Sequence, residues 1–153
     1  DNLRPIVKYA EQFGVIVAIE PVWKHIVYSV ERAKAVLDAI DSPNLQIILD
    51  PVNLLYPGNI KDQDEIIKKA FELLGKDIAV IHCKDFIDEG KDVDLKSVAA
   101  GTGGLDGKGG LNYPLLLKLI KEHKPYVHCT LENTVPENAV ATREFMENLY
   151  ESL

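Results

Sequence analysis

The sequence predicts an α/β fold in which parallel (β/α) units form about half of a TIM barrel. Four short apolar runs, rich in β-branched residues, are typical of strands that are buried on both faces of a parallel sheet. Helical patterns separate these runs, which indicates a series of βαβ units. The chain has 153 residues, whereas a complete eight-stranded barrel needs about 250, so four units would account for one half.

An open, doubly wound sheet is the alternative arrangement for four strands with covering helices. The chain begins with a helical pattern that no strand precedes, whereas a doubly wound domain normally begins on a strand. The barrel half is therefore favoured. No stretch of the sequence resembles a linker or a low-complexity segment, so we expect residues 1–153 to form a single domain.

The first part of the chain is expected to contain two helices and two strands. Apolar residues recur with helical spacing over residues 2–13. The first strand then runs to Glu20 and is stopped by a proline. Ser29 can cap a helix that extends to about residue 40, because its side chain can accept the hydrogen bonds of the first free N–H groups. The second strand ends at Asp50.

The rest of the chain continues the alternation of helices and strands. One exception is a long connection, rich in Gly, Asp and Lys, that separates the third strand from the next helix. The expected elements, in chain order, are a helix from Asp62 or Asp64 to Gly75, a strand ending at His82, the connection 83–112, a helix from Pro114 to about His123, a strand over about 126–132, and a last helix that follows Pro136 and ends near Tyr150.

The composition disfavours two classes of partner. The chain has 17 basic and 24 acidic residues, a net charge of −7, and no cluster of Lys or Arg, so no nucleic-acid partner is expected. No apolar run approaches the roughly 18 residues that a membrane span needs, so no membrane partner is expected. Cys83 and Cys129 lie in strand ends without the spacing of a zinc site, which predicts two reduced, buried thiols in a cytoplasmic protein.

Each of the four predicted strands ends in a residue of metal-ligand type: Glu20, Asp50, His82 and Glu132. In parallel α/β folds the carboxyl ends of the strands meet at the active-site edge, so these side chains are expected to converge. A single acidic residue at a strand end is more often a helix cap or an ion-pair partner. Four together need a shared partner, because a buried carboxylate or imidazole without one costs several kcal/mol. A divalent cation is the simplest such partner. Three carboxylates and one imidazole suit Mn²⁺ or Mg²⁺ best, with Co²⁺ or Zn²⁺ as alternatives.

Five short motifs lie at or near the predicted strand ends: IEP at 19–21, LDPVN at 49–53, HCKD at 82–85, GKGGLNY at 107–113 and LEN at 131–133. Together they resemble the motifs of the sugar phosphate isomerase/epimerase family of xylose-isomerase-like TIM barrels. Each motif alone is weak, but their order and spacing together are specific for the superfamily. The resemblance extends over the whole chain and implies strands five to eight, the carboxyl-terminal half of the family's barrel.

The resemblance also implies an activity and a set of roles. The order Glu20, Asp50, His82, Glu132 is the family's metal set. In that family the metal polarises a carbonyl and hydroxyl pair of a sugar, which acidifies the adjacent C–H. Glu20 and Glu132 would be the catalytic acid and base, while Asp50 and His82 would be ligands only. The expected function is thus a metal-dependent isomerase or epimerase acting on a sugar, sugar phosphate or polyol by proton abstraction next to a carbonyl.

Departures from the family pattern concern the expected substrate-binding residues. Many members have His at the place of Asn53, and many have an Arg shortly after the metal-binding His. We expect Lys84 to contact the substrate in place of that Arg, although a surface lysine is the alternative. His25 lies just beyond the first strand end, where it could contact a substrate or belong to a solvated loop. His25, Asn53 and Lys84 are therefore the predicted substrate-binding residues.

Other functions remain open at this point. An endonuclease-IV-like DNA-repair hydrolase shares the fold, but it needs additional histidines that this sequence does not supply near Asn53 or after His82. Dehydratase and aldolase chemistry share the enolisation step. The chain could also be a fragment of the full enzyme or a non-catalytic half-barrel. Because a half-barrel leaves two unpaired edges and an apolar inner face, we expect a homo-oligomer rather than a working monomer.

Overall fold

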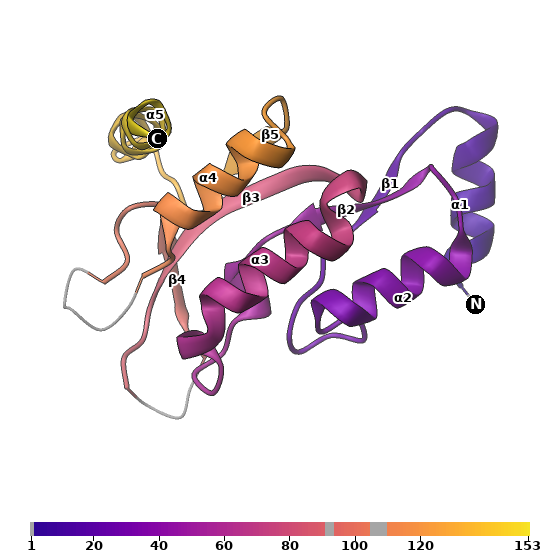
Figure 1. Ribbon diagram of the computed structural model, residues 1–153, viewed down its shortest axis with the longest axis horizontal. Helices are drawn as coiled ribbons and strands as arrows, with labels where there is room; N and C mark the ends of the chain where they lie inside the picture. Colours follow the sequence, from indigo (N-terminus) through magenta and orange to yellow (C-terminus); the bar gives the residue numbers. More distant parts are fainter. Residues whose placement is uncertain (1, 91–93, 105–109) are drawn as a thin grey trace.

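The computed structural model describes residues 2–90, 94–104 and 110–153, which form one curved sheet with helices packed against it (Figure 1). The strands are β1 (Val17–Ile19), β2 (Leu45–Leu49), β3 (Ile78–Ile87), β4 (Lys96–Ala99) and β5 (His128–Leu131). The α-helices are α1 (Leu3–Gln12), α2 (Val30–Ile40), α3 (Gln63–Leu74), α4 (Tyr113–His123) and α5 (Ala139–Ser152). Three short 3-10 helices are η1 (Val52–Leu54), η2 (Ile60–Asp62) and η3 (Gly75–Asp77).

Four of the strands form a parallel sheet in the order β1, β2, β3, β5. Each strand pairs with the strand of the next βα unit, as consecutive strands of a barrel do. The predicted fold class, an α/β fold of parallel βα units forming part of a TIM barrel, is confirmed. In Figure 1, α2, α3 and α4 lie along the same side of this sheet, α1 lies beside the β1 end, and α5 lies beside α4.

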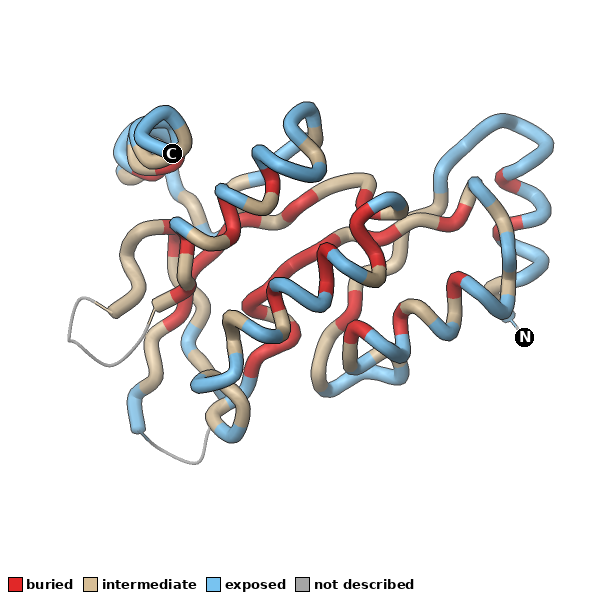
Figure 2. The backbone as a smooth tube through the Cα atoms, in the orientation of Figure 1, coloured by how far each residue is buried: buried red, intermediate tan, exposed pale blue. Residues whose placement is uncertain are grey.

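The core lies between the sheet and the covering helices, and Figure 2 shows buried residues along the strands and on the helix sides that face them. Side chains alternate along the strands, so one row faces the helices and the next faces the inside of the barrel. In the helix-facing row, Ile47 and Ile81 are completely buried. In the inner row, Ile48 and Val80 are half-buried and Thr130 is exposed.

Local sequence signals explain the helix starts. Ser29 caps α2, because its Oγ accepts a hydrogen bond from the N–H of Arg32 at 3.2 Å. Asn112 caps α4 in the same way, accepting from the N–H of Leu115 at 3.1 Å, and Pro114 lies in the first turn, where its missing N–H is not needed.

The long connection contains secondary structure that the sequence analysis missed. β3 does not end at His82 but continues to Ile87, and this extension pairs with the antiparallel strand β4. The prediction of a strand end at His82 was therefore wrong. Residues 107–109 of the glycine-rich motif lie outside the described residues.

The two cysteines have different environments. Cys83 is buried, as expected, but Cys129 is exposed, because β5 is an edge strand of the parallel sheet. The expectation of two buried thiols was wrong for Cys129. Among the residues that the structure describes, no helix combines the length and the apolar character that crossing a membrane would require.

Candidate metal centre

The four predicted ligands come together at the carboxyl edge of the parallel sheet. Glu20 directly follows β1, Asp50 follows β2, and Glu132 follows β5, while His82 lies within β3. The strand pairings bring these ends to similar heights, since Leu49 pairs with Ile81 and Cys83 pairs with Leu131. The predicted convergence follows from the parallel order of the strands.

His82 lies between two carboxylates. Its Nδ1 is 3.1 Å from Oε1 of Glu20 and 2.9 Å from Oε1 of Glu132. The contact with Glu20 has hydrogen-bond geometry, whereas the contact with Glu132 is a close approach of charged groups, so the imidazole holds both carboxylates near one point.

Asp50 is the most deeply buried member of the site, with 0% of its surface exposed. Its Oδ1 accepts a hydrogen bond from the backbone N–H of Asn53 at 3.1 Å. Its Oδ2 lies 2.7 Å from Nζ of Lys84, but the angle is poor for a hydrogen bond, so this oxygen is paired by charge alone. Burial raises the pKa of Asp50 to about 6, although the Lys84 ammonium opposes this shift.

Lys84 links two of the predicted ligands. Its ammonium lies 2.7 Å from Oδ2 of Asp50 and donates a hydrogen bond to Oε2 of Glu132 at 2.9 Å. The residue is buried, and the neighbouring carboxylates raise its pKa although burial opposes them. The alternative of a surface lysine is therefore wrong. The sequence could not show that one lysine bridges two strand ends, because this depends on the strand register.

The other two predicted substrate-binding residues have different positions. Asn53, in η1, donates a hydrogen bond from its side-chain amide to Oε1 of Glu20 at 2.9 Å, so it belongs to the carboxylate network. His25 is exposed in the loop after β1, and within the described residues no hydrogen bond or ion pair joins its ring to the site.

Asp85, beside Lys84, is a structural residue that the sequence analysis did not single out. It is 3% exposed, and its carboxylate accepts backbone hydrogen bonds from Phe86 at 2.8 Å, Gly103 at 3.0 Å and Leu111 at 2.7 Å. It thereby ties Gly103 and Leu111, which flank the glycine-rich segment 104–110, to β3. Residues 82–87, HCKDFI, do not alternate between polar and apolar side chains, so the sequence carried no clear signal for the longer strand.

The donor set fits a divalent cation. One ligand atom from each of Glu20, Asp50 and His82 lies within 4.8 Å of the other two, and Glu132 contacts His82 from the neighbouring strand. Carboxylate oxygens are hard ligands and an imidazole nitrogen is a borderline one, a combination that divalent cations accept. The buried Oδ2 of Asp50 makes no well-formed hydrogen bond to a described residue and is held by the charge of Lys84, so a second cation could also use it.

Comparisons with known proteins agree with this fold. The sequence model of a family described as "xylose isomerase-like TIM barrel" matches residues 1–149. The structure is similar to a xylose isomerase domain protein from Planctomyces limnophilus, with a TM-score of 0.72 and 19% identity, covering 98% of this chain and 50% of that one. It is also similar to an IOLI protein with a binding zinc atom, with a TM-score of 0.64 and 24% identity over 98% and 51% of the two chains. A third similar structure is the 3-keto-D-glucoside 4-epimerase YcjR from E. coli, with a TM-score of 0.64 and 19% identity over 97% and 51%.

These likenesses are likenesses of fold, because every identity is below 25%. The chain spans about half the length of each of the three structures. A search of curated proteins found no match.

Proposed function

Because this chain belongs to the xylose isomerase-like TIM barrel family, we propose that it supplies the metal-binding half of a sugar isomerase or epimerase. The substrate would be a small sugar, sugar phosphate or polyol, and the reaction would abstract a proton from carbon next to a carbonyl. Strands β1, β2, β3 and β5 would correspond to the carboxyl-terminal half of the barrel.

The main support for this proposal is the arrangement of Glu20 and Glu132 around His82. Both carboxylates reach the same ring nitrogen, from β1 and β5, the two outer strands of the parallel sheet. Two carboxylates that approach a common centre from opposite sides can act on a substrate bound between them, one as base and the other as acid.

The neighbours of the two glutamates suit proton transfer. Asn53 and His82 both contact Oε1 of Glu20, and no hydrogen bond or ion pair to a described residue uses its Oε2. That oxygen can receive a proton from a substrate. Glu132 is held through both of its oxygens, by His82 and by Lys84. When Glu132 donates a proton to the substrate, the Lys84 ammonium can stabilise the carboxylate that remains.

We propose that Glu20, Asp50, His82 and Glu132 hold Mn²⁺ or Mg²⁺. The zinc of the similar IOLI structure is a reason to include Zn²⁺, and with it Co²⁺, in any test. When bound, the cation would polarise the substrate carbonyl and lower the pKa of the neighbouring C–H.

Substrate contacts would come from the residues around the metal set. Lys84 can bind a substrate hydroxyl or anionic oxygen, and Asn53 can offer its amide to a sugar hydroxyl. His25, in the exposed loop after β1, would contact the outer end of a substrate. A full pocket also needs a wall opposite the inner face of this sheet, so turnover depends on more than these strands.

We further propose a cytoplasmic location, on the absence of a cysteine framework.

Replacing Glu132 with Gln tests this function. In the complete protein that contains this half-barrel, loaded with Mn²⁺, we expect Glu132→Gln to slow exchange of the substrate C–H proton with solvent by at least ~10²-fold. The amide can neither take nor return a proton. NMR of a panel of ketoses in deuterated buffer measures this exchange. Glu137→Gln, at an exposed glutamate outside the site, is the matched control and should exchange at the normal rate. Near-normal exchange by a folded, metal-loaded Glu132→Gln protein would exclude Glu132 as an acid or base.

A further inference from the structure

We infer that Lys84 is a built-in counter-ion that a divalent cation must displace, so that metal binding at this site is an exchange of cations. This inference rests on the metal site proposed above. The ammonium of Lys84 lies 2.7 Å from Asp50 and 2.9 Å from Glu132, two of the four predicted ligands. It therefore takes the carboxylate oxygens that a metal would use.

The burial of Asp50 explains why a resident cation is needed. Asp50 has none of its surface exposed, and an ionised carboxylate in such a place requires an opposite charge close by. Among the described residues, Lys84 is the lysine that forms an ion pair with Asp50 and also with Glu132. The lysine thus allows the carboxylates to gather in the metal-free protein.

The oxygens of these two ligands are already engaged. Oδ1 of Asp50 accepts from the N–H of Asn53, and its Oδ2 pairs with Lys84. Oε1 of Glu132 contacts His82, and its Oε2 accepts from Lys84. A divalent cation held by Asp50 and Glu132 would lie within contact distance of the ammonium, and like charges at that distance repel strongly in a buried site. The side chain of Lys84 must therefore leave at least one of them.

The backbone of Lys84 can stay in place during such an exchange. Its carbonyl accepts a hydrogen bond from the hydroxyl of Tyr113 at 2.8 Å, and the residue pairs with Ala99 of β4. Only the flexible four-carbon stem needs to change rotamer. The displaced ammonium then becomes available to a substrate oxygen, so the metal would prepare the substrate contact proposed for Lys84.

Metal affinity gives the first test. In the full chain, Lys84→Met keeps most of the apolar stem and removes the charge, so we expect it to bind Mn²⁺ at least ~10-fold more tightly than the unmodified protein by titration calorimetry. Lys69→Met is the matched control. It removes an ammonium that also pairs with a glutamate, Glu31, at 2.8 Å, but on the exposed surface. Its Mn²⁺ affinity should stay within about 2-fold.

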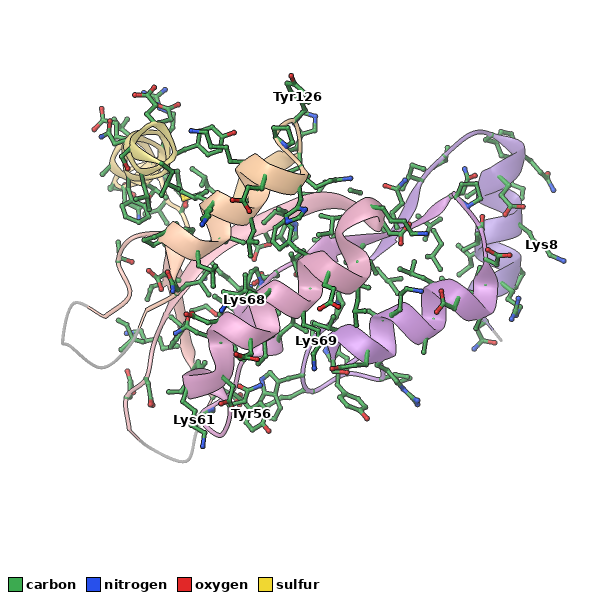
Figure 3. All side chains as sticks on the ribbon, in the orientation of Figure 1. Lys8, Tyr56, Lys61, Lys68, Lys69 and Tyr126 are labelled. Carbon is green, nitrogen blue, oxygen red and sulfur yellow. The ribbon has the colours of Figure 1, made fainter. Side chains whose placement is uncertain are left out.

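Exposure of the amine gives a second test, which needs no substitution and therefore does not depend on the folding of a variant. The unmodified protein is treated with an amine-acylating reagent with and without Mg²⁺, and the labelled lysines are identified by mass spectrometry. Lys84 is buried and should be labelled slowly without metal and several-fold faster with it. Lys8 and Lys61, which project from the surface in Figure 3, should show no change and serve as internal controls.

The two measurements separate failure of this inference from failure of the proposed function. Tighter binding by Lys84→Met together with metal-dependent labelling of Lys84 would establish the exchange. Metal binding without a change in Lys84 labelling, or weaker binding by Lys84→Met, would overturn the exchange and leave the metal site intact. If neither protein bound any of Mn²⁺, Mg²⁺, Co²⁺ or Zn²⁺, the metal site itself would be refuted, and the exchange with it.

Discussion

At the scale of single residues, Asp50 shows how burial and charge oppose each other in this site. Burial is the largest influence on its carboxyl group and raises the pKa to about 6, while Lys84 lowers it. The unfolded chain has the ordinary value of 3.8, so the native state holds the extra proton between about pH 4 and 6. Through that interval this group makes the free energy of unfolding of the metal-free protein fall as the pH rises.

A direct titration checks this balance. We expect the side-chain carboxyl carbon of Asp50, followed by ¹³C NMR in the metal-free full chain and assigned with Asp50→Asn, to titrate with a midpoint of about 6. Lys84→Met should move the midpoint higher, because it removes the charge that opposes burial. A midpoint near 4, or a downward shift in Lys84→Met, would contradict the burial and pairing described for Asp50.

The sequence predicted that four side chains would converge at one edge of the sheet but not how they are paired. Glu20, Asp50, His82 and Glu132 were predictable because each lies at or near the end of a parallel strand, and parallel strand ends meet at one edge. The bridge that Lys84 makes was not predictable, since it depends on the register of β3 against two other strands and on a side-chain rotamer.

At the scale of elements, the extension of β3 and its attachment to the glycine-rich segment depend on Asp85. The carboxylate is almost fully buried and accepts three backbone hydrogen bonds. Gly103 is required at its position, because a Cβ there would lie 2.1 Å from Oδ1 of Asp85. The side chain of Asp85 thus fixes the positions of Gly103 and Leu111 relative to β3.

Asp85→Asn is expected to lower the free energy of unfolding by about 2–4 kcal/mol, because an amide nitrogen cannot accept the N–H groups that a carboxylate oxygen accepts. Chemical denaturation measures the change, and hydrogen exchange should become faster at the amides of Gly103 and Leu111. Asp88→Asn is a suitable control, since Asp88 accepts one hydrogen bond from a described residue, the N–H of Gly90, at 2.9 Å in an exposed turn. An equal effect of both substitutions would show that Asp85 has no special role.

Local signals predicted the helices well and the long connection poorly. Ser29 and Pro114 mark helix starts through interactions within a few residues, so the sequence alone was enough. β4 forms because the extension of β3 offers it a partner, and its four residues have no pattern strong enough to predict a strand by themselves. The exposure of Cys129 also depends on strand order rather than on local sequence.

At the scale of the whole molecule, the inner face of the sheet is only partly covered. Ile16 is 46% exposed, Ile48 and Val80 are half-buried, and Thr130 is exposed on the same inner row. β1 and β5 also leave unpaired edges in the described parallel sheet. An apolar face with free edges favours association.

We therefore expect the 153-residue chain, produced alone, to self-associate at micromolar concentration, as sedimentation velocity would show. Val80→Glu places a charge on the inner face and should shift the chain toward monomer. Val140→Glu, at a residue of α5 that is 60% exposed, should not. A stable monomer with normal isomerase turnover would contradict the half-barrel interpretation.

The order of the strands also has a consequence for how the site forms in time. Val17 pairs with Leu45, Ile47 with Ile78, and Val80 with His128, so every parallel contact joins segments separated by a helix. The chain must lose the entropy of closing each of these long loops before any contact compensates for it, which slows folding. Each strand brings one ligand, so the last strand to dock decides when the cluster of charges is complete. The cluster of carboxylates is therefore complete only after β2 and β3, which carry the buried Ile47 and Ile81, have paired with their neighbours.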